Sequence, residues 1–209
     1  MSEQKYLNNV ILRTLLTAFS KLILAFSAEF HIIEEARIPR SGKVIIAPNH
    51  VSSFDGFLLQ LAVSRHLFFM GKEEAFKNPF SAWLMKQLGV FPVNRGILDR
   101  NAIRNAFNVL DSGLALVVFP EGTRTYGTGL VPAKNGVSHI AKKTNSKIIP
   151  VTIIGAEKLF SHFFRKTKIE LVIHNPIDPS SEPSPKSLTE KVMRSIASCY
   201  PSALRGIYG

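Results

Sequence analysis

Several features that decide the class of a protein are scarce or missing in this sequence. Its 209 residues include a single cysteine, Cys199, which lies in an apolar stripe with helical spacing. That setting predicts a packing role for Cys199 rather than a catalytic thiol. Neither a G-x-G-x-x-G dinucleotide loop nor a P-loop is present. No group of histidine, cysteine and carboxylate residues has the spacing of metal ligands, so we expect neither a metal nor a cofactor.

Acidic residues are also few. The chain has 15 Asp+Glu against 26 Lys+Arg, which gives a net charge of +11 spread along its length. Nucleic acid, an anionic membrane or phosphate-bearing substrates can all use such a surplus. Helix-turn-helix, zinc-finger and aromatic ribonucleoprotein motifs are absent, so we expect no nucleic-acid partner. Because 45% of the residues are hydrophobic, an anionic membrane surface is the favoured partner.

No charge-free apolar run reaches the roughly 18 residues of a membrane-spanning helix. The most apolar stretch, residues 7–30, is interrupted by Arg13 and Lys21, and it lacks the cleavage site of a signal peptide. Its apolar residues share one helical face, which favours a helix in the membrane interface over a helix buried in the domain. We therefore predict an N-terminal membrane-association helical segment, 1–38, followed by a folded domain, 39–209.

Two other segments combine aromatic and basic residues. Residues 159–166 suit insertion at a lipid headgroup boundary, and equally a hairpin whose phenylalanines pack inward. Residues 76–83 include Phe80 and Trp83 and can line an acyl or lipid entry path. For this second segment, packing in the core is the favoured interpretation.

Short apolar runs alternate with amphipathic patterns along the rest of the chain. This alternation predicts an α/β fold with a mixed, largely parallel sheet flanked by helices. A Ser187-x-x-Glu190 capping box predicts the start of a final helix. The other expected elements are strands at residues 43–47, 67–70, 114–119, 148–152 and 169–174, and a helix at 99–111.

The first polar motif follows the apolar run 43–47. Pro48 and Asn49 break that run, so His50 is expected just beyond the carboxyl end of a strand, where open α/β sheets bind ligands. On an uninterrupted helix, His50 and Asp55 would lie about 140° apart, too far to pair. If Ser52 or Ser53 caps a new helix, Asp55 falls in its first turn and can meet His50. A histidine held by a carboxylate can act as a general base, whereas the alternative is two unconnected surface residues.

A second polar turn follows the apolar run 114–119. It reads Pro120-Glu121-Gly122-Thr123-Arg124. Gly122 lets backbone amides approach a ligand closely, and the guanidinium of Arg124 suits phosphate oxygens. The alternative is a surface ion pair between Glu121 and Arg124. Two polar turns that each follow a strong strand favour the binding interpretation.

Together these motifs resemble the glycerolipid acyltransferase family, and within it the bacterial 1-acylglycerol-3-phosphate acyltransferases. Asn49, His50 and Asp55 match the family's N-H-x-x-x-x-D block. Residues 119–124 match its F-P-E-G-T-R block without substitution. Residues 89–95 resemble its glycine-to-arginine block, and residues 148–152 resemble its proline-containing strand. The resemblance spans residues 43–155, in the same order.

One block departs from the family pattern. Where the family often has F-K-x-G-A, this chain has Ala133-Lys134-Asn135-Gly136-Val137. Lys134 and Gly136 are retained and the aromatic residue is not. The matched positions imply a catalytic pair, His50 and Asp55. They also imply the substrate-binding residues Arg95, Glu121, Gly122, Thr123, Arg124 and Lys134.

The resemblance implies direct acyl transfer without an acyl-enzyme, by an acyltransferase domain at 39–209. His50 deprotonates the acceptor hydroxyl, Asp55 orients the imidazole, and the alkoxide attacks an acyl thioester. Lysophosphatidic acid is the expected acceptor and phosphatidic acid the product, with acyl-CoA or acyl carrier protein as donor and co-substrate. The expected location is the cytoplasmic face of the inner (plasma) membrane, with peripheral or monotopic attachment. Alternatives are another lysophospholipid, glycerol 3-phosphate or an aminolipid as acceptor, or a non-catalytic peripheral membrane lipid-binding protein.

Overall fold

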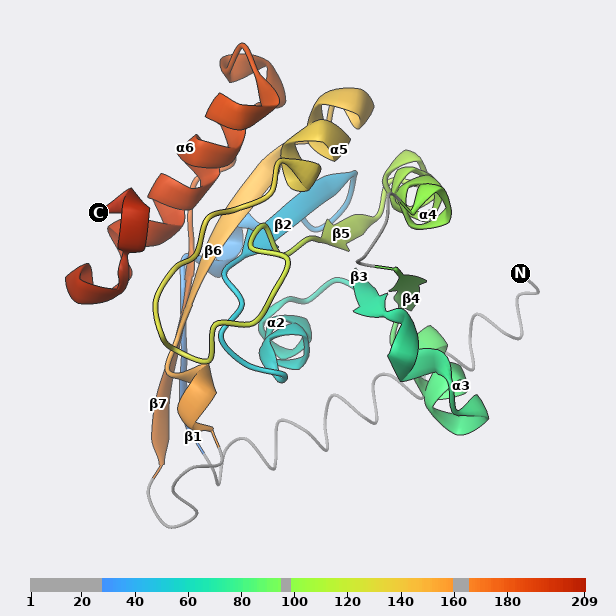
Figure 1. Ribbon diagram of the computed structural model, residues 1–209, viewed down its shortest axis with the longest axis horizontal. Helices are drawn as coiled ribbons and strands as arrows, with labels where there is room; N and C mark the ends of the chain where they lie inside the picture. Colours follow the sequence, from blue (N-terminus) through green and yellow to red (C-terminus); the bar gives the residue numbers. More distant parts are fainter. Residues whose placement is uncertain (1–27, 95–98, 160–165) are drawn as a thin grey trace.

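The computed structural model describes residues 28–94, 99–159 and 166–209, which form one seven-stranded sheet with helices on both faces (Figure 1). The strands are β1 (Ala28–Ile33), β2 (Val44–Pro48), β3 (Leu67–Lys72), β4 (Val90–Val93), β5 (Ala115–Val117), β6 (Ile148–Ile154) and β7 (Thr167–Ile173). The helices are α2 (Asp55–Ala62), α3 (Pro79–Gln87), α4 (Arg100–Asp111), α5 (Gly136–Thr144) and α6 (Pro185–Ser198). The expected strands and the helix at 99–111 are thereby confirmed, with shifts at their ends.

The sheet is mixed and largely parallel, as predicted. Its strand order is β1-β7-β6-β2-β5-β3-β4, and the antiparallel neighbours in it are β6 and β7. Strands β6, β2, β5, β3 and β4 therefore all end at one edge, which we call the carboxyl edge. Ligands of open α/β sheets bind at such an edge.

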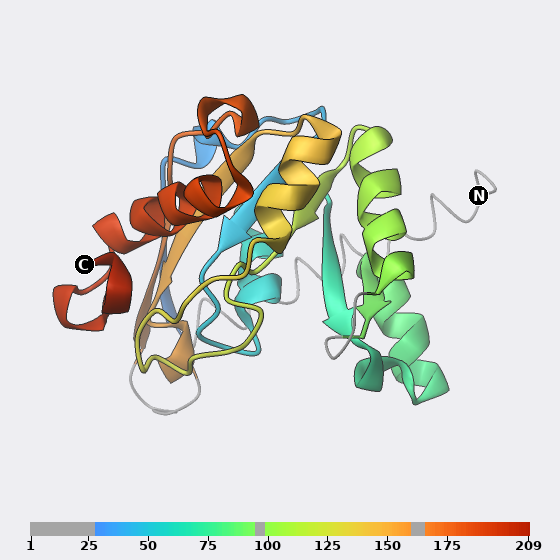
Figure 2. The ribbon, with the colours of Figure 1, turned by 45° about the horizontal axis from the view of Figure 1, so that its top comes forward.

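The helices form two layers. The connections from β2 to β3 and from β3 to β4 step in one direction along the sheet, and those from β4 to β5 and from β5 to β6 step back. Because such crossovers are right-handed, α2 and α3 cover one face and α4 and α5 the other. Helix α6 packs beside α5 on that second face (Figures 1 and 2).

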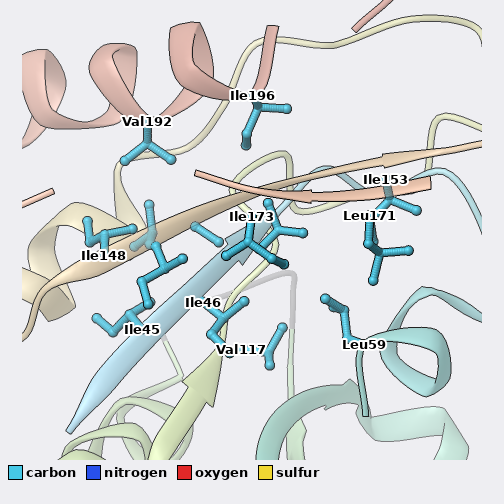
Figure 3. Close-up of a cluster of buried hydrophobic side chains, with 14 of the residues drawn as sticks. Ile45, Ile46, Leu59, Val117, Ile148, Ile153, Leu171, Ile173, Val192 and Ile196 are labelled. Atoms are coloured by element: carbon cyan, nitrogen blue, oxygen red, sulfur yellow. The ribbon is translucent and has the colours of Figure 1, made fainter. Parts of the chain in front are cut away.

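The core lies where the central strands are covered on both faces. Strand β2 is buried over its whole length, and Ile45, Ile46, Ile148 and Ile153 have no exposed surface. Side chains from both layers and from the sheet meet in this cluster (Figure 3). Continuous apolar runs of this kind are typical of parallel strands that are buried on both faces. The end of β2 is therefore held rigidly at the carboxyl edge.

Strand β1 corrects the predicted boundary at residue 38. Residues 28–33 pair in parallel with β7 and alternate between buried and exposed positions. They belong to the sheet, not to a helical segment, because a short apolar run fits period 2 as readily as the helical period. The remaining part of the predicted segment, 1–27, lies outside the described residues. Across the described ranges, no helix combines the length and apolar character needed to span a membrane.

The end of the chain brings two more corrections. Helix α6 begins three residues earlier than predicted, since Ser184 is its N-cap and exchanges hydrogen bonds with Ser187 at the third helical position. Pro185 occupies the first helical position, where its fixed φ and missing N–H cost nothing. Cys199 follows the helix at its C-cap and is exposed rather than packed in the core. The apolar stripe of Leu188, Val192 and Ile196 is buried, as expected.

The prediction of core packing for residues 76–83 is wrong. None of the residues of α3 is buried, and the Phe80 and Trp83 side chains are 69% and 48% exposed. The prediction failed because aromatic residues are usually buried, whereas these two face outward. Most of the other aromatic and basic segment, residues 160–165, lies outside the described residues.

Removing the cap of α6 tests this description of the fold. The variant Ser184→Ala should lower the free energy of unfolding by about 1 kcal/mol, since the Ser187 amide loses its hydroxyl acceptor. Ser195→Ala, inside the same helix, is the control and should change it by less than about 0.5 kcal/mol. Urea titrations followed by circular dichroism measure both. Equal effects of the two substitutions would contradict the assigned cap.

Candidate active site

His50 and Asp55 meet at the carboxyl edge, just after β2. The His50 Nδ1 atom lies 2.7 Å from Asp55 Oδ2, and the Asp55 side chain is fully buried. The same oxygen accepts hydrogen bonds from the backbone amides of Val51, at 2.8 Å, and Ser52, at 2.9 Å. A carboxylate that accepts from Nδ1 fixes the proton on that nitrogen. The other ring nitrogen, Nε2, is therefore the one able to accept a proton from a substrate.

The local backbone differs from the prediction in one respect. Helix α2 begins at Asp55, as expected, but neither Ser52 nor Ser53 caps it through a side-chain hydrogen bond to its first turn. The Asp55 carboxylate turns back to the preceding loop and binds its amides. One acid therefore both orders the His50–Ser52 loop and orients the imidazole.

Asn49 fixes the chain immediately before His50. Its side-chain amide donates to the Ile153 carbonyl at 2.9 Å and its Oδ1 accepts from the Ile153 amide at 2.7 Å. Asn49 is completely buried, and these two bonds extend the pairing of β2 with β6 by one residue. The predictions did not include Asn49 among the site residues. Its position directly after a buried strand was the available signal.

The second motif lies on the loop between β5 and α5, and it is joined to the first through Glu121. The Glu121 side chain is buried, and its two oxygens accept from the amides of His50, at 2.7 Å, and Val131, at 3.2 Å. The carboxylate is thus occupied by the protein's own backbone. In this geometry Glu121 holds the two loops together, and its role in substrate binding stays a prediction. The geometry also corrects the alternative of a surface ion pair with Arg124.

Burial sets the ionisation of Glu121. Loss of hydration raises the pKa of its carboxyl group to about 7, the two amide bonds oppose this shift, and the charge of Asp55 adds to it. Two buried acids therefore contact His50, Asp55 at its ring and Glu121 at its backbone amide. The second acid can remain neutral near physiological pH, which limits the repulsion between them.

Several further contacts hold the two loops together. The Thr125 amide donates to the His50 carbonyl at 2.8 Å, and the His50 ring stacks on Phe119 with centroids 3.9 Å apart. Gly122 has φ +67°, and a Cβ there would lie 3.3 Å from Lys134 Cδ. The Lys134 side chain therefore lies beside the glycine turn. A glycine adopts this left-handed backbone without strain and leaves room for the Lys134 side chain.

Arg124 points toward the first motif. Its guanidinium donates to the Ser53 hydroxyl, and its Cζ lies 5.5 Å from the centroid of the Tyr126 ring. These contacts hold the guanidinium on the same side as the His50 loop. The sequence predicts Ser53 only as a helix cap, and it gives no role for Tyr126. The signal for both residues in the sequence is that a hydroxyl or an aromatic side chain lies within or near a motif that carries a predicted phosphate-binding residue.

The structure places the other predicted residues as follows. Thr123 is exposed at the tip of the turn, between Gly122 and Arg124. Arg95 lies outside the described residues. Within the described ranges, no group of three or more histidine, cysteine or acidic side chains is arranged to hold a metal ion.

Comparison with known proteins identifies the fold and the family. A model of the Acyltransferase family matches residues 29–154, which is more than half of the chain. The chain belongs to the acyltransferase family. The match contains both motif loops and both halves of the His50–Asp55 pair, and it begins within β1. The predicted family and the prediction of an enzyme that transfers acyl groups are confirmed.

Individual relatives agree with this assignment. A Bacillus subtilis protein named 1-acyl-sn-glycerol-3-phosphate acyltransferase is 27% identical over 158 residues, covering 75% of this chain and 78% of that protein. A Streptococcus pneumoniae protein of the same name is 29% identical, and the aligned region covers 76% of this chain and 60% of that protein. Among solved structures, the 1-acyl-sn-glycerophosphate (LPA) acyltransferase of Thermotoga maritima is similar, with a TM-score of 0.77 and 26% identity. That match covers 94% of this chain and 81% of the other.

The ionisation of Glu121 predicts a pH dependence of stability. The folded state raises the pKa from 4.5 to about 7, so it binds the proton more tightly than the unfolded chain does. The contribution of Glu121 to stability is therefore greatest below the unfolded pKa and is lost as the pH rises through the folded one. The loss should be on the order of 3 kcal/mol, at 1.36 kcal/mol per pKa unit.

The variant Glu121→Gln tests this sign, because its side chain does not titrate. We expect it to be less stable at low pH, since an amide cannot accept from both backbone N–H groups. Its free energy of unfolding should change less than that of the unmodified protein between pH 4.5 and about 7. Denaturant unfolding over this range measures both curves. Parallel curves would show that Glu121 does not titrate in this window.

Proposed function

We propose that this acyltransferase moves a fatty acyl group from an acyl thioester to the sn-2 hydroxyl of lysophosphatidic acid and so forms phosphatidic acid. The observation that carries the proposal is the arrangement of His50, Asp55 and Arg124 on two adjoining loops. A proton acceptor and a phosphate-binding cation are held together, and a hydroxylated phosphate ester is the acceptor that uses both. The names of the similar proteins support the same acceptor.

The hydrogen bonds support a mechanism in which each group has one task. His50 Nε2 takes the proton of the acceptor hydroxyl while its Nδ1–H stays bonded to Asp55. The alkoxide oxygen forms a bond to the thioester carbonyl carbon, and the carbonyl electrons move to oxygen. When that tetrahedral species collapses, the carbon–sulfur bond breaks and the imidazolium returns its proton to the departing thiolate. No acyl-enzyme is formed, and the exposed Cys199 has no part in the reaction.

Arg124 holds the acceptor phosphate in this scheme. Its planar guanidinium can bind two phosphate oxygens, and the Ser53 hydroxyl and the Tyr126 ring fix its direction. Lys134 beside Gly122 adds a second positive charge, and Arg95 is proposed as a third. Fixing the phosphate also fixes the hydroxyl beside His50, so positioning supplies part of the rate. The donor is acyl-CoA or acyl carrier protein, and the reaction needs no metal or resident cofactor.

We place the enzyme at the cytoplasmic face of the inner membrane. Its net charge of +11 suits an anionic bilayer, and the apolar N-terminal residues suit attachment in the membrane interface. The acceptor carries an acyl chain that can stay in the bilayer during the reaction. Peripheral or monotopic attachment allows the phosphate and the hydroxyl to enter the site from the membrane surface.

The catalytic pair is tested by two substitutions. His50→Ala should lower kcat by about 10²–10⁴-fold, the usual contribution of a general base. Asp55→Asn should lower it severely as well, because the amide lacks the charge that stabilises the imidazolium. Thiol release from the acyl donor measures both rates. Circular dichroism is the control for folding, and turnover near normal in either folded variant would contradict the mechanism.

The acceptor is tested with a panel of hydroxyl compounds. Lysophosphatidic acid should be used in preference to glycerol 3-phosphate, which lacks the acyl chain, and to lysophosphatidylcholine, whose cationic headgroup meets Arg124. Arg124→Lys retains the charge but not the two-pronged geometry, so it should raise KM for lysophosphatidic acid about 10-fold, since a lost bond to a charged group costs roughly 1.5 kcal/mol.

Formation of radiolabelled phosphatidic acid, measured beside thiol release, reports both quantities. Faster transfer to glycerol 3-phosphate or to the choline lipid would show that lysophosphatidic acid is not the preferred acceptor. A rise in KM for the acyl donor alone would assign Arg124 to the donor site.

A further inference from the structure

Helix α3 is an apolar helix without a buried face. Six of its nine residues are Pro, Phe, Ala, Trp, Leu or Met, yet none of the nine is buried. Phe80 and Trp83 are the most exposed of its large side chains, and their rings stack with centroids 6.0 Å apart. A helix on a sheet normally buries an apolar stripe. Large apolar side chains that gather at the surface of a soluble domain mark an interaction site.

The first turn of α2 adds two more exposed rings. Phe54 and Phe57 are 40% and 41% exposed. Helices α2 and α3 follow the carboxyl ends of β2 and β3, and they cover the same face of the sheet (Figures 1 and 2). One strand, β5, separates β2 from β3, so the ends of the two strands that precede these helices are about 10 Å apart across the sheet. We call Phe54, Phe57, Phe80 and Trp83 the aromatic patch.

The charges next to the patch favour a lipid surface as its partner. Lys72 and Lys77 precede α3 at the carboxyl edge and Lys86 lies in its last turn, and all three are exposed. Glu73 and Glu74 are acidic residues in this connection, which leaves a small positive excess. Aromatic rings bordered by lysines suit a bilayer interface, where rings enter the headgroup boundary and ammonium groups meet lipid phosphates.

The location of the patch points to the same partner. Phe54 and Phe57 follow His50 by four and seven residues, and α3 follows the end of β3 at the same edge of the sheet. An acceptor whose acyl chain stays in the bilayer can reach His50 only if this edge faces the membrane. A second protein molecule covering the patch would instead separate the edge from the lipid.

We propose that the aromatic patch is a membrane-docking surface of the folded domain, which enters the interface of an anionic bilayer and holds the carboxyl edge against it. The inference that the carboxyl edge faces the bilayer rests on the proposed function. The inference that the aromatic patch enters the bilayer interface does not, because it follows from the exposed rings and the lysines.

The chain provides its own probe, because Trp83 is its single tryptophan. The full-length protein is mixed with vesicles of equal parts phosphatidylglycerol and phosphatidylcholine. Trp83 emission should shift to shorter wavelength, and lipids brominated near the headgroup should quench it. Co-sedimentation verifies that the protein is bound. Bound protein with unshifted and unquenched emission would overturn the proposal. Emission that is already shifted without lipid, and that depends on protein concentration, would overturn it in favour of contact between two copies.

A pair of substitutions tests the energetic contribution of the patch. Phe80→Ser should weaken partitioning into these vesicles roughly 3–10-fold, the effect of withdrawing part of one aromatic side chain from lipid. Ile207→Ser is the matched control, because Ile207 is 67% exposed and lies near the C-terminus, at the opposite end of the molecule from α3 (Figure 1). It should leave partitioning unchanged. Equal partitioning of the two variants would contradict the proposal.

Activity separates this proposal from the proposed function. Phe80→Ser should transfer acyl groups to a short-chain, water-soluble lysophosphatidic acid at the normal rate. It should be slower, in proportion to its weaker binding, with acceptor embedded in vesicles. If the unmodified protein acylates no lysophosphatidic acid, the proposed function fails while the quenching of Trp83 still decides the docking surface. If Phe80→Ser loses both activities equally while folded, Phe80 acts in the site and the docking role is wrong.

Discussion

The buried carboxylate of Glu121 is the contact on which the site depends. It accepts from an amide on each of the two motif loops, so the loop that carries His50 and the loop that carries Arg124 keep a fixed separation. Other contacts between the two loops include the hydrogen bond from the Thr125 amide, the hydrogen bond from Arg124 to Ser53, and the stacked rings of His50 and Phe119. The proposed general base and the proposed phosphate-binding residue therefore share one support.

That support has an electrostatic consequence. In the proposed mechanism Asp55 orients the imidazole, and a second anion close by would compete for the same proton. Because burial raises the pKa of Glu121 to about 7, part of its population can stay neutral. The difference in environment between the two acids is clear. Asp55 has two amides and an imidazole on one oxygen, whereas Glu121 has one amide on each oxygen.

The fold and the position of the pair could be predicted from the sequence, because they depend on local patterns. Apolar runs of strand length and the break at Pro48 placed His50 at the end of a strand, and the five-residue spacing to Asp55 required a helix start between them. The inward direction of Glu121 could not be predicted, since a polar turn does not show which of its side chains is buried. The exposed rings of Phe80 and Trp83 reversed the usual behaviour of aromatic residues, and composition gives no signal for that.

The antiparallel pairing of β6 with β7 has a consequence for how the domain can be attached. Because β7 reverses against β6 and β1 runs parallel with β7, Ala28 enters the sheet at the carboxyl edge rather than at the opposite one. The chain before Ala28 is thus connected at the edge that holds His50, at one end of the strand order, while α3 adjoins β4 at the other. Six strand spacings, about 29 Å, separate these ends. A single attachment lets a domain swivel, whereas attachment at Ala28 together with the proposed contact of α3 would fix which edge faces the supporting surface.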